Sequence, residues 1–295
     1  MKNSKKIGII GGSSFLGQHL VDLFVRKNFK VIHTYCKKKI SSKKNSLSKK
    51  LDLSTQINPK KLSKLFGSVK TVIYVSTIYP VVKINYKILK VNFLSVIDIA
   101  NWCKKNKIKF VYLSTSSIYS SKNKKQLEKD FVDEDMQGGL YSLLKSMSEN
   151  YILSLKKNKF DYLILRPSSI YGPNQNKGSL ICNISKKIRN KKNVFFYNPL
   201  NIKLNLIDVR DVARSIVQLI ELNKVGIFNI GSTQSITLKK LIQIIKKFYS
   251  KIKILKKEII IKRNVYINPN VDKLKNTGFK NQYIIDEYFK ELTRK

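Results

Sequence analysis

Short apolar strands that alternate with helical stretches constrain the fold of this 295-residue chain more than any other feature. Runs rich in β-branched and aromatic residues predict strands at Lys6–Ile10, Lys30–Tyr35, Thr71–Thr77, Lys109–Thr115, Tyr162–Ser168 and Gly226–Ile230. Apolar residues at helical spacing predict helices at Phe15–Lys27, Asn85–Lys105, Leu140–Leu155, Leu238–Phe248 and Ile284–Leu292. Strands separated by helices form βαβ units, so we expect an α/β fold with a doubly wound parallel sheet.

A glycine-rich turn joins the first strand to the first helix. The backbone N–H groups and the dipole at a helix start can bind the pyrophosphate of a dinucleotide. The residues expected to contact it are Gly11, Ser13, Ser14, Phe15, Leu16 and Gly17. Ser14 stands where the dinucleotide-binding pattern has its middle glycine, which normally lets the backbone approach the pyrophosphate closely. We expect this serine to be tolerated, although a purely structural strand–helix turn is the alternative for this stretch alone.

A candidate catalytic set follows further along the chain. Thr115 comes at the end of a predicted central strand, where open α/β sheets bind ligands. Tyr141 and Lys145 are one helical turn apart on one helix face. The lysine is expected to stabilise a phenolate and so lower the tyrosine pKa from about 10. Tyr141 would then move a proton on a substrate oxygen while a nicotinamide moves hydride on the carbon. A Tyr-x-x-x-Lys pair alone also occurs by chance.

These motifs, in this order, resemble those of the extended short-chain dehydrogenase/reductase family, in particular its NAD(P)-dependent nucleotide-sugar epimerases, dehydratases and reductases. "GGSSFLG" is similar to the family's TGxxGxxG, "LYSLLKSMSE" to xYGxSKxxxE, and "LRPSSIYGPNQ" to LRPxNVYGPxQ. Further similar stretches are "LDLS", "VNFLSVIDIA", "YLSTSSIYS", "LNLIDVRDVARSIVQLIE" and "FNIGSTQSITLKKLIQII". The similarity covers nearly the whole length, which makes the match specific.

The resemblance implies roles for individual residues. It implies a Rossmann-type sheet and a catalytic set of Thr115, Tyr141 and Lys145, of which Tyr141 and Lys145 also contact the cofactor. It places Asp52 beside the adenine. Further cofactor contacts are implied at Leu53, Val75, Asn92 and Ser168, and substrate contacts at Ser116, Ser117 and Ser169. The family resemblance also implies a nucleotide-sugar substrate and allows a homodimer formed through a helix bundle.

Some positions depart from the family pattern. Ser116 and Ser117 stand where the 4,6-dehydratases have Asp-Glu, and Ser169 stands where many sugar-nucleotide members have Asn. Elimination of water needs an additional acid and base, which two serines do not supply. We therefore expect ketone reduction, alcohol oxidation or 4-epimerisation rather than dehydration.

The chain is expected to divide into two lobes. Residues 1–170, with 206–232 returning to them, would form the NAD(P)-binding Rossmann domain. Residues 171–205 and 233–295 would form a smaller, discontinuous C-terminal lobe that binds substrate. The polar segments Lys37–Lys50 and Lys122–Gly139 are predicted to be exposed loops.

The composition restricts partners and setting. The net charge is +41, but only 7 of the 59 basic residues are arginine, whose fork is preferred for nucleic-acid recognition. We expect no specific nucleic-acid partner and only weak, salt-sensitive attraction to polyanions. No apolar run reaches the ~18 residues of a membrane span. The three cysteines are widely spaced, which indicates no disulfide framework and no metal site, and favours a cytoplasmic protein.

The end of the second strand bears on the choice between NAD and NADP. NAD-preferring proteins of this fold usually place Asp or Glu there, to hold the adenosine ribose. Here that position falls on Tyr35, and no carboxylate occurs from Val31 to Lys50. Lys37 and Lys38 follow and are predicted to pair with a 2′-phosphate, so NADP is slightly favoured over NAD.

Two other functions stay open on the sequence alone. A relative that binds dinucleotide without turnover, as a redox sensor or scaffold, would account for Ser14. A basic nucleic-acid-binding protein on the same fold would account for the charge, and is the less favoured of the two.

Overall fold

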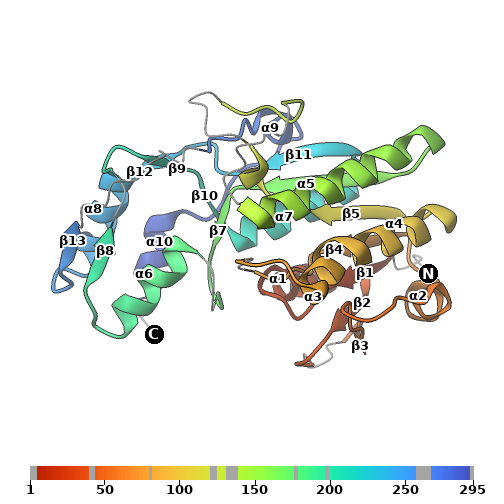
Figure 1. The fold of residues 1–295 in the computed structure, drawn as a ribbon. Helices are drawn as coiled ribbons and strands as arrows, with labels where there is room; N and C mark the ends of the chain where they lie inside the picture. Colours follow the sequence, from red (N-terminus) through yellow and green to blue (C-terminus); the bar gives the residue numbers. More distant parts are fainter. Residues whose placement is uncertain are drawn as a thin grey trace.

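A parallel sheet forms the centre of the protein in a computed structural model that describes residues 5–39, 44–79, 82–119, 125–130, 139–175, 179–196, 199–256 and 267–292. Within these residues, seven strands pair in the order β11-β6-β5-β4-β1-β2-β3 (Figure 1). The strands are β1 (Lys6–Ile10), β2 (Lys30–Tyr35), β3 (Ser46–Lys50), β4 (Thr71–Tyr74), β5 (Lys109–Leu113), β6 (Tyr162–Pro167) and β11 (Gly226–Ile230). All of their pairings are parallel. The predicted doubly wound, Rossmann-type sheet is confirmed.

Helices cover both faces of this sheet because alternate strand residues point to opposite faces. On one face, α1 (Phe15–Arg26) and α7 (Val209–Glu221) pack on a core that includes Ile7, Ile9 and Val111. On the other face, α2 (Pro59–Phe66), α4 (Ser95–Lys105) and α5 (Gly139–Ser154) pack on a core that includes Ile10 and Val72. The sheet is thereby buried on both sides, which positions its carboxyl ends as the accessible edge.

The structure corrects several expected boundaries. The expected loop Lys37–Lys50 contains β3, a lysine-bearing edge strand that the alternation of apolar residues did not reveal because only Ser48 of it is buried. The expected helix Asn85–Lys105 is divided into α3 (Tyr86–Leu89), a π-helical turn (Lys90–Leu94) and α4. β4 and β5 end before the predicted Thr77 and Thr115. Part of Lys122–Gly139 lies outside the described residues.

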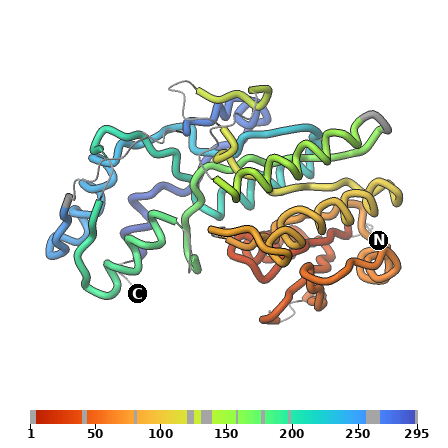
Figure 2. Tube along the Cα trace, in the orientation of Figure 1, coloured from red at the N-terminus to blue at the C-terminus, as the bar shows by residue number. Residues whose placement is uncertain are grey.

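A second lobe lies beside the sheet, where Figure 2 traces it in green and blue. Its own apolar core joins α6 (Leu180–Arg189), α8 (Leu238–Phe248) and α10 (Ile285–Leu292). Short strands complete it in three pairs: β7 (Ser169–Tyr171) with β10 (Leu206–Asp208), β8 (Val194–Phe196) with β13 (Ile254–Lys256), and β9 (Lys203–Leu204) with β12 (Ile236–Thr237). Leu274, in α9 (Asp272–Lys275), and Phe279 pack instead in the core of the sheet.

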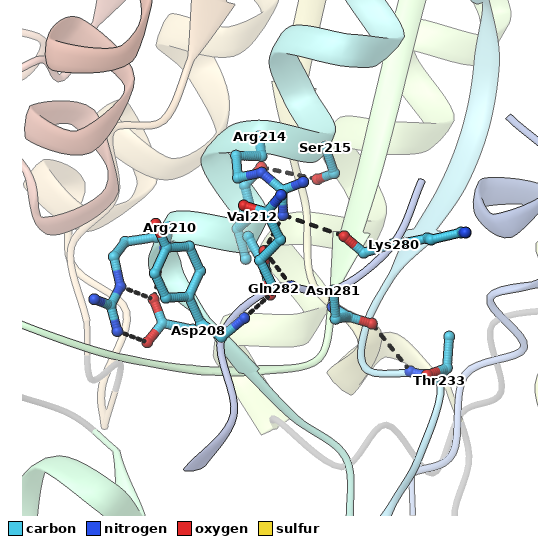
Figure 3. A network of polar contacts seen from close by, with 11 residues as sticks. Asp208, Arg210, Val212, Arg214, Ser215, Thr233, Lys280, Asn281 and Gln282 are labelled. Carbon is cyan, nitrogen blue, oxygen red and sulfur yellow. Dashed lines mark hydrogen bonds and ion pairs between the residues drawn. The ribbon is translucent and has the colours of Figure 1, made fainter. Parts of the chain in front are cut away.

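A polar network ties the end of the chain to α7 (Figure 3). The carboxylate of Asp211 accepts hydrogen bonds from the backbone N–H groups of Gln282 and Tyr283. The guanidinium of Arg210 stacks on the Tyr283 ring at 3.8 Å and pairs with Asp208. Since Asp208 also caps the N-terminus of α7, this network fixes the segment before α10 against the sheet domain.

Candidate active site

A cavity of about 640 Å³ opens at the carboxyl ends of β1, β2 and β4. This is the edge where open α/β sheets bind ligands, and the volume lies within the roughly 300–1,000 Å³ typical of ligand sites. Of the predicted cofactor contacts, the cavity is lined by Gly11, Ser13, Ser14, Tyr35, Lys37, Lys38, Asp52 and Leu53. Its lining also includes residues that were not predicted: Thr34, Cys36, Leu51, Ser54, Ser76, Thr77, Ile78, Asn85, Lys87, Ile88 and Val91.

The glycines of the turn are required by close backbone packing. Gly11 has φ of +89°, and a Cβ there would lie 2.9 Å from the backbone nitrogen of Ser76. A Cβ on Gly17 would lie 2.1 Å from the carbonyl oxygen of Gly11. Side chains at either position would push α1 away from the strand ends, so the turn keeps its shape only with glycine at these two places.

Ser14 is the N-cap of α1. Its backbone is extended, with φ of −73°, so the position does not require glycine. The Ser14 hydroxyl accepts a hydrogen bond from the Gly17 N–H at 3.1 Å, and its own proton is still able to point into the cavity. The first-turn N–H groups of Phe15 and Leu16 have no intrahelical acceptor. The turn therefore fits an anion such as a pyrophosphate at the start of α1.

Charged groups gather at the end of the cavity formed by β2. Lys37 and Lys38 are exposed and line it, and Lys87 reaches it from α3. Hydrogen bonds from the hydroxyl and the backbone N–H of Ser54 lower the pKa of Asp52, and the charge of Lys87 lowers it further. Asp52 is therefore an ionised acceptor in a cavity that three lysines also line, which suits the polar end of an adenosine phosphate.

Two further predicted cofactor contacts, Asn92 and Val75, lie behind the cavity wall. Asn92 is buried in the π-helical turn, where its side chain accepts a hydrogen bond from the Ile78 N–H at 2.8 Å and donates to the Ile78 carbonyl at 3.0 Å. Val75 is buried, and its N–H donates to Ile10. In this structure Asn92 anchors the loop that carries Thr77 and Ile78 into the cavity wall.

The predicted catalytic residues lie where the end of β5 meets α5. The hydroxyl of Thr115 accepts a hydrogen bond from the Ser117 N–H at 3.1 Å and so caps the short turn after β5. Ser142, next to Tyr141, donates to the Ser117 carbonyl. Lys145 donates to the Leu113 carbonyl at 2.7 Å, and its nitrogen lies 5.8 Å from the centre of the Tyr141 ring. The hydrogen bonds from Ser142 and Lys145 thus hold α5 against the end of β5.

Burial shifts both titratable groups of this set. It raises the pKa of the Tyr141 phenol and lowers the pKa of Lys145 to about 7. The expected lowering of the Tyr141 pKa by Lys145 therefore stays a prediction for the protein with bound cofactor. Loss of hydration disfavours the phenolate, and the lysine nitrogen is directed at the Leu113 carbonyl instead of the phenol oxygen.

The serines assigned to the site occupy different environments. Ser168 is buried after β6, and its hydroxyl has no partner among the described residues; the same holds for Ser114, next to Thr115. Ser116 is buried in the turn after β5, and Ser117 is partly exposed. Ser169 is exposed on β7. Unpartnered buried hydroxyls at two strand ends are available to a ligand at this edge of the sheet.

Comparison with known proteins identifies the family. A sequence model described as "NAD dependent epimerase/dehydratase family" matches residues 7–231. The chain belongs to this family. Within it, the chain is of the extended short-chain dehydrogenase/reductase type, as the motifs indicated. A Methanocaldococcus jannaschii protein provisionally named UDP-glucose 4-epimerase is 28% identical over 257 residues, which are 81% of this chain and 80% of the relative.

Solved structures of epimerases and dehydratases share the fold of this family member. A dTDP-glucose 4,6-dehydratase from Bacillus anthracis in complex with NAD has a TM-score of 0.85 and 20% identity, covering 99% of this chain and 96% of that one. A UDP-glucose 4-epimerase from Thermotoga maritima with UDP-glucose has a TM-score of 0.82 and 20% identity, covering 98% of both chains.

Other kinds of site were also sought in the described residues. They contain no group of three or more histidine, cysteine or acidic side chains that could hold a metal ion. Within the same residues, no helix has the length and apolar character needed to cross a membrane. Cys36 is exposed at the cavity, whereas Cys103 and Cys182 are buried, and all three are free thiols.

Proposed function

We propose that this protein is an NAD(P)-dependent oxidoreductase or epimerase that acts on a nucleotide-linked sugar. The observation that carries the proposal is the pair of half-buried Tyr141 and buried Lys145 at the end of β5, on the same sheet edge as the cavity. UDP-glucose in one structural neighbour and NAD in another support this ligand class.

The bound nicotinamide would supply the site that exchanges hydride with the substrate carbon. Tyr141 would transfer the proton of the oxygen on that carbon, taking it during oxidation and returning it during reduction. Thr115 would hydrogen-bond the same oxygen. Lys145 would turn from the Leu113 carbonyl to the cofactor ribose and the phenol, where its charge stabilises the phenolate. Ser116 and Ser117 provide no acid–base pair for dehydration.

NADP is proposed as the preferred cofactor. Lys37 and Lys38 line the cavity after β2, and Lys87 adds a third cation from α3. Tyr35 stands where a ribose-binding carboxylate would otherwise exclude the 2′-phosphate. Asp52 lines the same cavity, accepts a hydrogen bond from the Ser54 hydroxyl, and is proposed to face the adenine.

We also propose that the second lobe, 171–205 with 233–295 apart from α9 and Phe279, which pack on the sheet, holds the nucleotide sugar, and that two copies associate through α5. The exposed side chains Leu140, Leu143 and Met147 of α5 are spaced to form one apolar stripe.

Free thiols are compatible with the proposed cytoplasmic location.

The test is a panel of UDP- and dTDP-linked hexoses and their N-acetyl forms, incubated with protein and either cofactor. Redox turnover is followed by the absorbance of reduced nicotinamide, and epimers are separated by chromatography. We expect turnover of at least one substrate. A protein that binds cofactor but converts no member of a broad panel would instead support the non-catalytic alternative.

A further inference from the structure

A second tyrosine packs directly on the proposed proton-transfer residue. The ring of Tyr79 meets the ring of Tyr141 edge to face, with centroids 5.0 Å apart and an interplanar angle of 77°. Aromatic pairs favour this geometry, which brings the positive edge of one ring to the negative face of the other. Tyr79 is still 49% exposed, so one side of its ring rests on Tyr141 while the rest faces solvent.

The loop that carries Tyr79 is held firmly up to the preceding residue. The amide of Asn92 binds both backbone groups of Ile78, and the Thr77 hydroxyl donates to the same side chain at 3.3 Å. Thr77 and Ile78 line the cofactor cavity. Tyr79 directly follows Ile78, the residue that Asn92 anchors. The same loop therefore lines the cofactor cavity with Thr77 and Ile78 and contacts Tyr141 with the ring of Tyr79.

On its other side, Tyr141 faces the lysine of the catalytic set. The Lys145 nitrogen lies 5.8 Å from the Tyr141 ring centre and 4.7 Å from that of Tyr112, which is buried in β5. Among the described residues, the titratable groups around Tyr141 are Tyr79 from the loop after β4, Lys145 from its own helix, and Tyr112 from β5. Of these, only Tyr79 also reaches solvent, where a substrate would arrive.

We propose that Tyr79 is a positioning residue for Tyr141: its ring holds the phenol in the orientation needed for proton transfer and keeps water from it. The inference rests on the proposed function of Tyr141, and it adds a residue that none of the sequence motifs marked. A half-buried phenol can swing about the Cα–Cβ bond unless a neighbour restrains it, and small errors in the position of its oxygen reduce proton-transfer rates strongly.

The proposal makes separate demands on the ring and on the hydroxyl of Tyr79. Tyr79→Ala removes the ring and should lower kcat about tenfold, because misplacement of a reacting group is costly. Tyr79→Phe keeps the ring and should retain kcat within about twofold. The Tyr79 phenol adds to burial in raising the pKa of Tyr141.

The first measurement does not need a substrate. The ring resonances of Tyr141, labelled with ¹³C-tyrosine and assigned with Tyr141→Phe, report the ring current of a neighbour. We expect them to shift in Tyr79→Ala and to stay near their wild-type positions in Tyr79→Phe. Tyr86→Ala is the matched control, since Tyr86 is 70% exposed on α3. Unchanged Tyr141 resonances in Tyr79→Ala would overturn the proposal even if no substrate is ever found.

The second measurement uses the substrate found by the panel, with cofactor affinity as a check on folding. Reduced kcat in Tyr79→Ala, with rescue by Tyr79→Phe and an unchanged cofactor Kd, supports the positioning role. Equal loss in both variants would assign the effect to the hydroxyl and overturn it, as would unchanged kcat in Tyr79→Ala. If Tyr141→Phe is fully active, the proposed function fails, whereas the resonance test of the ring contact keeps its own outcome.

Discussion

The two ends of the site differ in how far their charged and titratable groups are exposed to water. At the end of β2, the lysines are exposed, and hydrogen bonds from Ser54 lower the pKa of the cavity carboxylate Asp52. At the end of β5, Lys145 is buried and Tyr141 is half-buried, and loss of hydration lowers the pKa of the first to about 7 and raises that of the second. Charge recognition thus takes place in water and proton handling away from it. We therefore expect salt to act on the first end and pH on the second.

The largest effect is expected at the catalytic end. Tyr141→Phe removes the proton-transfer group and should reduce kcat about 10²–10⁴-fold. Cofactor affinity should change little, because the substitution keeps the ring and removes a single hydroxyl. Steady-state rates and a cofactor titration on the same preparation check both statements. A Phe variant within threefold of wild-type kcat would contradict the assignment of Tyr141 as the proton-transfer group.

Lys145 should matter for both ends. Lys145→Met should lower kcat about 10²-fold and also weaken cofactor binding, because the lysine is proposed to reach the ribose. Burial lowers the pKa of Lys145 to about 7, so its stabilising charge is present below pH 7 and is lost as the pH rises through that value. Any part of kcat that depends on the charge should fall over the same range, and Lys145→Arg should abolish that bend. A pH profile with the same bend in the Arg variant would assign it to another group.

At the adenosine end the expected effect is smaller. Exposed charge pairs contribute up to about 1 kcal/mol each, so Lys37→Ala/Lys38→Ala should weaken NADP roughly tenfold and leave NAD nearly unchanged. Dissociation constants at ~150 mM salt screen the general attraction of the basic surface. Lys49→Ala/Lys50→Ala, two exposed lysines at the end of β3, is the matched control. Tighter binding of NAD than of NADP by the wild type would refute the preference.

The smallest effect concerns Ser14. Loss of an N-cap hydroxyl costs about 1 kcal/mol, so Ser14→Ala should lower Tm by about 2 °C, whereas Ser14→Gly should cost only a few tenths of a kcal/mol. Thermal unfolding of both variants with and without cofactor separates capping from binding. An Ala variant as stable as wild type would show that the 3.1 Å contact with Gly17 does not stabilise α1.

The sheet was predictable because its strands are apolar and its helices amphipathic. β1, β2 and β11 begin and end at the predicted residues, and α8 does too. β3 escaped prediction because it is a polar edge strand stabilised by backbone pairing with β2. The signals for α2 were present, since Asn58 caps it and Pro59 opens it, but its lysines obscured the apolar face of Leu62 and Phe66.

Residues of the candidate site were predictable where they directly follow a strand in the sequence. Lys37 and Asp52 line the cavity because the ends of parallel strands meet at one edge. Lys87 and Tyr79 carry no such local signal. Their positions depend on Asn92 anchoring Ile78, a contact between residues 14 positions apart. The raised pKa of Tyr141 was likewise hidden, because burial is a property of the folded protein.

Charge recognition at the end of β2 and proton handling at the end of β5 are separate in this protein. The most direct test of this separation is to measure the NADP Kd and kcat of one preparation over a grid of salt and pH. The account predicts that raising salt from about 50 to about 200 mM weakens NADP binding and leaves kcat at saturating cofactor nearly constant. It also predicts that changing pH across 7 alters kcat far more than NADP affinity. A kcat that falls with salt in parallel with NADP affinity, or that is flat across this pH range, would contradict it.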